Sequence, residues 1–351
     1  MLKNIVRMLP AVVIVAATIN TMSCNNGNGL FPQEGGGAAS SSVTPTSSSL
    51  TPTPSSTPTA AAAAAVAFVT NFNDGMVSSF TRNTSTGALT HTGQVQAGVK
   101  AGPRGVVAAP DGRSLYVANI NDDNIYEFSI NQTDGKLTPL ATPSVSNGNA
   151  TEPDELAMNG AGTLLWVTGR AGTVTAYTVD TATGKLTKKS SIDGFNTPFG
   201  IAVHPTLPVI YVSDLKTGLI QPMSYNTGNG LLSKNLPAVA SSDPNAKIPA
   251  ALTIDPAGTA LFAPNQGNGE GSSFAIDGSG ALTPIHAATN SKVGVVDPQG
   301  VFVYTANSAD GTVKVSKIKG ACPSKMCAGT TVSAESPHNA SSGPFGIAVL
   351  H

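Results

Sequence analysis

Charged residues are scarce in this chain. They make up 11% of the sequence and nearly cancel, with 19 basic and 20 acidic side chains. An average soluble protein has about 25% charged residues. The densest basic groups are two loose sets of lysines: Lys185, Lys188 and Lys189, then Lys314, Lys317 and Lys319. Because nucleic-acid binding requires a basic face that neutralises phosphates, the composition disfavours a nucleic-acid partner.

Aromatic residues are also few, at 5%, whereas the chain contains 37 glycines and 25 prolines. Its polarity comes from Ser, Thr, Asn and Gly rather than from charge. This composition favours many short strands joined by tight turns over charged amphipathic helices. The length of 351 residues does not by itself divide the chain into domains, because all-β folds often exceed about 200 residues as one domain.

The three cysteines are unevenly placed: Cys24 stands alone near the N-terminus, while Cys322 and Cys327 form a close pair. This spacing predicts one modified thiol and one disulfide, formed in an oxidising compartment. The alternative for the pair is a metal site with two thiolates. It would lack the further Cys or nearby His ligands that such a site requires.

Residues 1–23 have the order of a bacterial export signal. Lys3 and Arg7 precede the apolar run Met8 to Thr18, and Ser23 stands before Cys24. The run is shorter than the roughly 20 residues of a membrane-spanning helix. Residues 21–24 resemble a lipoprotein signal in the last two positions, although Thr21 replaces the expected Leu-like residue. We expect lipidation of Cys24; ordinary cleavage that leaves a free thiol is the alternative.

Residues 24–65 are of low complexity, rich in Ser, Thr and Pro and ending in a run of alanines. They have too little apolar surface to offset the entropy of ordering, so the sequence predicts a disordered tether. A tether after a lipid-capable cysteine would hold a folded head clear of a membrane. The protein is therefore expected in the cell envelope, either as a membrane-anchored lipoprotein or in secreted form.

The body, residues 66–351, is internally repetitive. One motif, an apolar strand that usually starts at Pro, a turn, and a second strand of the Tyr-Val-x-Asn type, begins at residues 103, 153, 198, 249 and 291. Repeats of roughly 40 to 50 residues are typical of propeller blades. A third alternating strand follows, and then a Gly-x-Leu hairpin with Leu at positions such as Leu137, Leu186 and Leu231; in the last internal unit the segment with Cys322 and Cys327 replaces this hairpin. Each unit thus holds four antiparallel strands.

The two ends of the body complement each other. The C-terminal segment 343–351 reads as a first strand, while the segment from Val66 reads as a second strand that lacks its first. Joined, they complete one blade and leave no open sheet edge. The prediction is an all-β propeller of six four-stranded antiparallel blades, closed by pairing of the N- and C-terminal strands. Seven blades are the alternative.

The motifs YVAN, YVSD, WVTG and AFVTN, with PRGVVAAPDGRSLYV and the hairpins DGKLT and TGKLT, resemble the bacterial lactonase-type β-propellers. That group includes 6-phosphogluconolactonase and the YVTN-repeat surface proteins. The resemblance extends over nearly all of residues 66–351 and implies the propeller fold. For activity it implies hydrolysis of a lactone.

Enzymes of this family are expected to carry a histidine directly after the Pro of a first strand, with arginine and glutamate around the central channel. Here those prolines are followed by Arg104, Asp154, Phe199, Ala250 and Phe345, so this catalytic pattern is largely missing. The candidates that remain are Arg104, at a channel position, and Glu155, as an acid or base. A structural role for both is the alternative.

Other catalytic signatures are absent from the sequence. No Gly-x-Ser-x-Gly elbow occurs, and the five histidines have no metal-ligand spacing. His204 and Arg113 are interpreted as turn residues, and so is the segment 121–124. No cofactor is expected, apart from the calcium considered next.

The second strands end in polar residues that could form a ring at the channel mouth: Asn71, Asn119, Asp214, Asn265 and Asn307. Such a ring suits a sugar-like ligand or, with Asp214, a calcium ion. The alternative is that these residues cap the turns that follow them.

Two functions from different classes follow. The first is a monomeric binding module of the cell envelope, contacting a protein, peptidoglycan or polysaccharide, and touching the membrane only through its lipid. The second is an extracytoplasmic hydrolase of a lactone or sugar-derived ester, similar to 6-phosphogluconolactonase. Phosphogluconate, however, is a cytoplasmic metabolite. A convergent acid, base and cation at the channel would favour the enzyme.

Overall fold

The computed structural model describes residues 64–240, 251–264, 271–285, 295–296, 302–307, 312–317, 333–339 and 344–350. These residues all belong to one compact unit. The predicted export signal, Cys24, nearly all of the tether, the Cys322 and Cys327 pair, and Asn265 lie outside the described residues. No helix occurs in the described ranges, and hence none that could span a membrane.

The described strands form six antiparallel sheets, three of which come from the N-terminal half. The first sheet contains β25 (Pro344–Leu350), β1 (Val66–Asn71), β2 (Met76–Arg82) and β3 (Leu89–Gln96). The second contains β4 (Pro103–Ala108), β5 (Ser114–Asn119), β6 (Asn124–Ile130) and β7 (Leu137–Ser146). The third contains β8 (Pro153–Met158), β9 (Leu164–Gly169), β10 (Thr173–Val179) and β11 (Leu186–Ile192).

The other three sheets follow the same order. One contains β12 (Pro198–Val203), β13 (Val209–Asp214), β14 (Leu219–Tyr225) and, both paired with β14, β15 (Leu232–Ser233) and β16 (Val239–Ala240). The next contains β17 (Thr253–Ile254), β18 (Ala260–Pro264), β19 (Gly271–Ile276) and β20 (Leu282–Ile285). The last contains β21 (Val295–Val296), β22 (Phe302–Asn307), β23 (Thr312–Lys317) and β24 (Ser333–Asn339). The prediction of four-stranded antiparallel units is confirmed.

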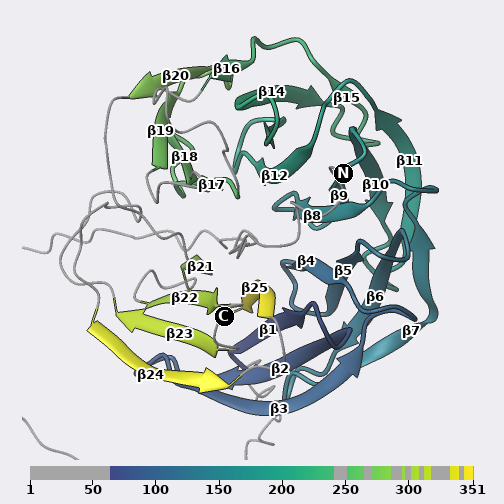
Figure 1. Ribbon diagram of the computed structural model, residues 1–351, viewed down its shortest axis with the longest axis vertical. Helices are drawn as coiled ribbons and strands as arrows, with labels where there is room; N and C mark the ends of the chain where they lie inside the picture. Colours follow the sequence, from purple (N-terminus) through teal and green to yellow (C-terminus); the bar gives the residue numbers. More distant parts are fainter. Residues whose placement is uncertain are drawn as a thin grey trace, which may run out of the picture. The chain divides into compact units, whose positions relative to one another are not determined.

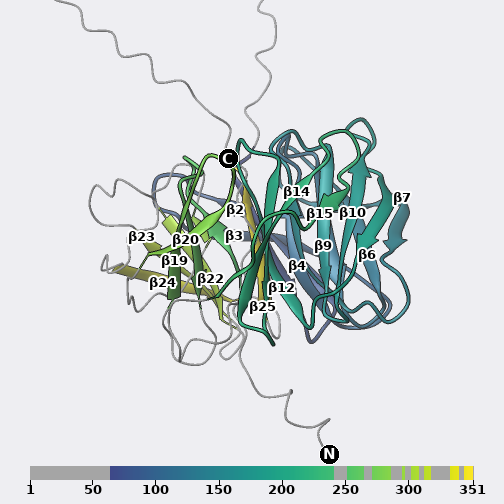
Figure 2. The same ribbon diagram turned by 90° about the horizontal axis from the view of Figure 1, so that it is seen from above.

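The sheets stand around a common middle, which is the architecture of a β-propeller (Figure 1). The first strand of each unit faces the middle, and the last strand, such as β7 or β11, lies at the rim. Neighbouring inner strands touch, as β25 with β4, β4 with β8, and β8 with β12. Figure 2, in which the sheets are seen from their edge, shows β25 and β4 side by side.

The two ends of the body meet in one sheet. β25 pairs antiparallel with β1, with Leu350 opposite Val66 and Ile347 opposite Val69. The pairing has an irregularity between Val69 and Asn71. The C-terminal strand therefore lies inside the N-terminal strand, nearest the middle (Figure 1).

The hydrophobic core lies between neighbouring sheets rather than on one face of each. One cluster joins Tyr116 and Ile125 of the second sheet to Leu165, Val167 and Tyr177 of the third. Because each sheet is covered on both faces, the inner strands are buried at every residue, as β4, β5, β8 and β9 show. This is why β5 and β9 are largely apolar instead of alternating, whereas β4 and β8 also bury the charged residues Arg104, Asp154 and Glu155.

Three of the second strands, β5, β9 and β13, each have an aromatic side chain that is hydrogen-bonded to the next sheet. Tyr116 Oη donates to the carbonyl of Gly184 at 2.7 Å, and Trp166 Nε1 donates to that of Gly230 at 2.9 Å. Tyr211 Oη repeats the contact with Gly280 at 3.0 Å. These glycines begin the Gly-x-Leu hairpins of the following unit. The aromatic residue and the hairpin thus form one repeated link between adjacent sheets.

Gly184 shows why glycine recurs at this place. Its φ of +76° is in the left-handed region that side chains rarely adopt. An added Cβ would also overlap with Oγ of Ser114 and approach Cβ of Ser114 to 3.3 Å. The hairpin therefore needs glycine both for its turn and for its close approach to the neighbouring sheet.

Candidate functional site

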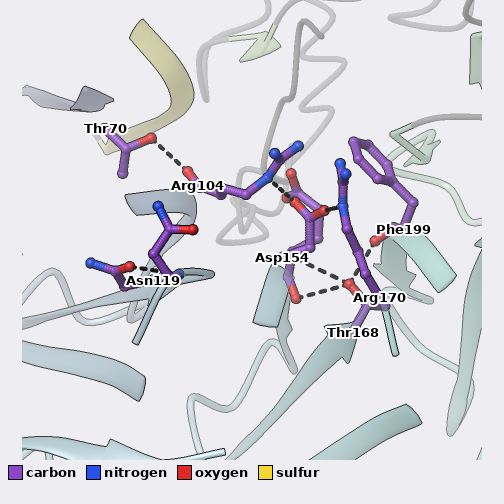
Figure 3. A network of polar contacts seen from close by, with 9 residues as sticks. Thr70, Arg104, Asn119, Asp154, Thr168, Arg170 and Phe199 are labelled. Carbon is purple, nitrogen blue, oxygen red and sulfur yellow. Dashed lines mark hydrogen bonds and ion pairs between the residues drawn. The ribbon is translucent and has the colours of Figure 1, made fainter. Parts of the chain in front are cut away.

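Three successive inner strands place their second residue toward the same region. Arg104 follows Pro103 in β4, Asp154 follows Pro153 in β8, and Phe199 follows Pro198 in β12. Equivalent positions of neighbouring units therefore converge in the middle of the propeller (Figure 3).

Asp154 joins two arginines. Nε of Arg104 donates to Oδ1 of Asp154 at 2.5 Å, and Nε of Arg170 donates to Oδ2. Arg170 directly follows β9. The Asp154 side chain is fully buried, while those of Arg104 and Arg170 are 8% and 20% exposed. A buried carboxylate is tolerated only when it is paired, and here each oxygen meets a guanidinium.

The guanidinium ends of Arg104 and Arg170 extend past Asp154 in the same direction and lie beside each other (Figure 3). The Phe199 ring lies 5.7 Å from Cζ of Arg104 and 5.1 Å from Cζ of Arg170. The Phe72 ring lies 5.8 Å from Cζ of Arg104. These cation–π contacts stabilise the orientation of two like charges that would otherwise repel.

Glu155 is the next residue of β8 and is 2% exposed. Its Oε1 atom has no hydrogen-bond partner in the described part of the chain. Burial raises the pKa of Glu155 well above its usual range, and the negative charge of Asp154 raises it further. Arg104 and Arg170 oppose this shift but do not cancel it. Glu155 therefore keeps its proton to a higher pH than an ordinary glutamate.

Burial also acts on Arg104, whose pKa falls to about 10. Asp154 raises this pKa and Arg170 lowers it. Since the value stays well above neutral pH, Arg104 remains a cation beside Glu155. The site thus combines two cations, one paired carboxylate and one buried carboxyl group whose pKa is raised.

Gly105 allows β4 and β8 to come close at this point. A Cβ at Gly105 would overlap with the carbonyl oxygen of Asp154 and lie 2.8 Å from Cα of Glu155. Glycine after Arg104 is therefore a steric requirement of the site.

The loop before β8 is held in an uncommon conformation. Ala150 and Glu152 have φ values of 52° and 51°, and Asp123 has a φ of 58°. Such conformations cost about 1 to 3 kcal/mol each for residues other than glycine. Asp123 stabilises the loop, because Oδ2 accepts from the Ala150 N–H and Oδ1 from the Glu152 N–H, both at 2.9 Å. Asp123 thereby fixes the segment that delivers Asp154 and Glu155.

The predicted polar ring is described only in part. Asn119 donates to the carbonyls of Ala97 at 2.7 Å and Lys100 at 2.8 Å. Asp214 accepts from the Asn196 N–H at 2.7 Å and from three further backbone N–H groups. These contacts are those of turn caps.

The contacts of the remaining ring residues do not point to a bound ligand. Asn71 donates to Ser78 Oγ at 2.9 Å, while the side chain of Asn307 lies outside the described part. No group of three His, Cys, Asp or Glu residues suited to a metal occurs in the described ranges. A ligand or calcium at the ring stays a prediction.

His204 has the turn role expected of it. Its Nδ1 accepts from the N–H groups of Thr206 and Leu207, and its Nε2 lies 2.9 Å from the carbonyl oxygen of Gly258. Burial lowers the pKa of His204, so the neutral ring is favoured. Arg113 is exposed in the turn between β4 and β5, as the sequence predicts.

Sequence reasoning selected Arg104 and Glu155 but missed Asp154, Arg170 and Phe199 as members of the same cluster. A signal for two of them was present, because Asp154 and Phe199 occupy the position after Pro that also holds Arg104. Arg170 has no such signal, since it lies just beyond a second strand. The antiparallel pairing of β8 with β9 in one sheet, which sets Pro153 opposite Gly169, brings it to Asp154.

The family model described as lactonase, 7-bladed beta-propeller matches residues 46–153 of the chain. The resemblance to the lactonase-type propellers is thereby confirmed over this part. The family model has seven blades, whereas the described residues form six sheets. A search of curated proteins found no match.

Solved structures show the same fold at low sequence identity. A candidate 6-phosphogluconolactonase from Bacteroides fragilis is 14% identical, with a TM-score of 0.58, and the match covers 84% of this chain and 100% of that one. One from Bacteroides uniformis is 18% identical, with a TM-score of 0.58, covering 81% and 84%. The periplasmic gluconolactonase of Pseudomonas aeruginosa is 18% identical, with a TM-score of 0.56, covering 79% and 80%.

Proposed function

We propose that the protein is an extracytoplasmic hydrolase that opens a lactone, or another ester derived from a sugar, at the cluster of Arg104, Asp154, Glu155 and Arg170. The observation that carries the proposal is the convergence of Arg104 from β4, the buried, protonatable carboxyl group of Glu155 from β8, and Arg170 from the end of β9. A cation together with an acid or base at one place favours an enzyme over a binding module. The gluconolactonase and 6-phosphogluconolactonase names of the similar structures agree with it.

The arginines supply electrostatic stabilisation. When water attacks the lactone carbonyl carbon, negative charge develops on the carbonyl oxygen, and guanidinium groups placed in advance stabilise that charge. Asp154 holds both arginines by their Nε atoms and so fixes the direction of their ends. The Phe199 ring makes cation–π contacts with both groups and so supports their orientation.

Glu155 moves the proton. Its carboxylate accepts a proton from the attacking water as the new C–O bond forms, and it returns this proton to the ring oxygen as the ester C–O bond breaks. The product is a hydroxy acid, which loses its acidic proton to solvent. A general base works best when its pKa is near the working pH, and burial raises the pKa of Glu155 in that direction.

The test is hydrolysis of glucono-δ-lactone and related sugar lactones, corrected for the spontaneous reaction. Glu155→Gln should reduce kcat/KM by about 100-fold or more, the typical contribution of a general base. Arg113→Gln, at an exposed arginine remote from the cluster, is the matched control and should leave turnover unchanged. Full activity of Glu155→Gln, or no turnover across the lactones, would contradict the proposal.

A second candidate is a binding module of the cell envelope. It is favoured by the pairing of Asp154 with both arginines, because groups bound to each other are suited to holding a ligand as much as to transforming it. Its partner would be an envelope protein, peptidoglycan or polysaccharide. Saturable binding of such a polymer without lactone turnover would favour this function.

The proposal also covers the export, membrane anchoring and blade number of the protein. The chain is exported through residues 1–23, is lipidated at Cys24 and carries a monomeric propeller on the tether 24–65. The Cys322 and Cys327 pair forms a disulfide outside the cytoplasm. The propeller has six blades, with β25 and β1 closing the ring; the six sheets and the β25–β1 pairing support this count. Labelling with a radioactive lipid precursor in wild type and Cys24→Ala tests the anchor.

A further inference from the structure

The strongest unexplained feature of the cluster is the placement of its charges. Arg104 and Arg170 end side by side, although each carries a positive charge, and Asp154 accepts a hydrogen bond from Nε of each (Figure 3). Among the described side chains, the two arginines and Asp154 sum to one net positive charge. A guanidinium pair of this kind suits a planar anion that bridges both groups.

The charge of Glu155 decides whether an anion is accepted. With Glu155 ionised, the cluster is neutral, and an added anion would leave one net negative charge in a buried site. With Glu155 protonated, the cluster has one positive charge that the anion neutralises. Because uncompensated buried charge is costly, anion binding and protonation of Glu155 favour each other.

We propose that the paired guanidinium ends of Arg104 and Arg170 bind a monoanionic carboxylate, and that each carboxylate is taken up together with one proton on Glu155. The carboxylate class follows from lactone hydrolysis, whose product is a hydroxy-acid anion. In this respect the inference rests on the proposed function, but it requires no turnover. The product is thus held most firmly at low pH and released as Glu155 ionises.

The groups that face Glu155 in the described chain are few. Arg104 lies in β4, Asp154 lies next to Glu155 in β8, and Arg170 directly follows β9. From β12 the uncharged Phe199 faces the cluster, and β5 has no charged residue in its sequence. The proton change on anion binding is therefore assigned to Glu155, since Oε1 is buried without a hydrogen-bond partner in this part of the chain.

The test is isothermal titration of the full-length protein with sodium gluconate in two zwitterionic buffers of different ionisation enthalpy. Gluconamide, which has the same polyol chain without charge, is the ligand control. At pH values where Glu155 is ionised in the free protein, wild type should take up one proton per gluconate and Kd should rise about tenfold per pH unit; at lower pH both proton uptake and the pH dependence of Kd should vanish. Gluconamide should bind at least about tenfold more weakly, a difference of roughly 1.4 kcal/mol.

Three variants test which residues are responsible for gluconate binding and proton uptake. Glu155→Gln should bind gluconate with no proton uptake and with the same Kd across the pH range. Arg170→Met should weaken binding by about tenfold or more, whereas Arg113→Gln should not change it.

The outcomes separate the two proposals. A wild-type Kd that does not depend on pH, or equal binding by Arg170→Met, overturns carboxylate binding coupled to Glu155. Lactone turnover without gluconate binding at low pH also overturns it and leaves the hydrolase intact. Coupled gluconate binding without lactone turnover overturns the hydrolase alone.

Discussion

Nε of Arg104 lies 2.5 Å from Oδ1 of Asp154, although the two residues are 50 positions apart in the chain. Both occupy the second position of an inner strand, one unit apart. The ion pair is thus a contact between equivalent places in successive repeats, made possible by Gly105, which lets β4 and β8 approach. The same positions that define the repeat therefore build the site.

Asp154→Asn should destabilise the protein strongly. It leaves Arg104 and Arg170 close together without their shared counter-charge, and breaking a buried ion pair typically costs about 3 to 5 kcal/mol. Urea unfolding at neutral pH measures the change. Asp111→Asn, at an exposed turn residue, is the control and should cost less than about 0.5 kcal/mol. Equal stabilities of the two variants would show that the pairing contributes nothing.

Glu155→Gln should stabilise the protein at neutral and higher pH. The pKa of Glu155 is raised in the folded state, so the folded protein binds more protons than the unfolded chain between the usual glutamate pKa, about 4.3, and the folded one. Wild-type stability therefore falls as pH rises through this window, while the contribution of Gln is flat. Thermal unfolding of both proteins should converge at low pH and diverge at high pH. Parallel curves would contradict the prediction.

Trp166→Phe should cost about 1 to 3 kcal/mol, because the buried carbonyl of Gly230 loses its donor. Tyr116→Phe and Tyr211→Phe remove the equivalent links to Gly184 and Gly280. Since the three links join different pairs of sheets and share no residue, their costs should add in the combined variant when measured by urea unfolding. An unchanged stability of any single variant would exclude a stabilising role for that link.

Gly184→Ala should destabilise by about 1 kcal/mol or more, through its positive φ and the overlap with Ser114. Gly160→Ala is the matched control, since its Cβ would meet nothing within 4 Å. In the double variant, Ser114→Ala should recover only the steric part of the loss. Full recovery in a double-mutant cycle would show that the turn conformation carries no cost.

Asp123→Ala should release the loop before β8. The N–H groups of Ala150 and Glu152 lose their acceptor, and two left-handed residues lose the contacts that hold them. Amide hydrogen exchange at Ala150 and Glu152 should accelerate by about tenfold or more, while exchange in β5 stays unchanged. Asp123→Asn, which keeps one acceptor oxygen, should have the smaller effect. Unaltered exchange at both amides would contradict the assignment.

Much of the fold could be predicted because its signals are local. Pro at the start of a first strand, the Tyr-Val-x-Asn type of second strand and the Gly-x-Leu hairpin recur in most units, and the described residues have strands and turns at these places. The pairing of β25 with β1 could also be predicted, because the C-terminal segment is a first strand and the segment from Val66 is a second strand that lacks one. The role of the polar ring could not be predicted from the sequence, because Asn and Asp are common both as ligand-binding residues and as turn caps, as Asn119 and Asp214 illustrate.

By itself, the sequence determined the antiparallel strands, their repeat, and Arg104 and Glu155 as candidates, because strand period, turn chemistry and residue type are properties of neighbours along the chain. The tertiary structure alone decided that Arg170 meets Asp154, that Phe199 stacks on both arginines, and that Glu155 is buried beside them. The first contact depends on the register between β8 and β9 within one sheet, and the contacts of Phe199 depend on how adjacent sheets are stacked. Burial then changes the proton affinity of Glu155, since the energy of a charge depends on the surroundings that the fold creates.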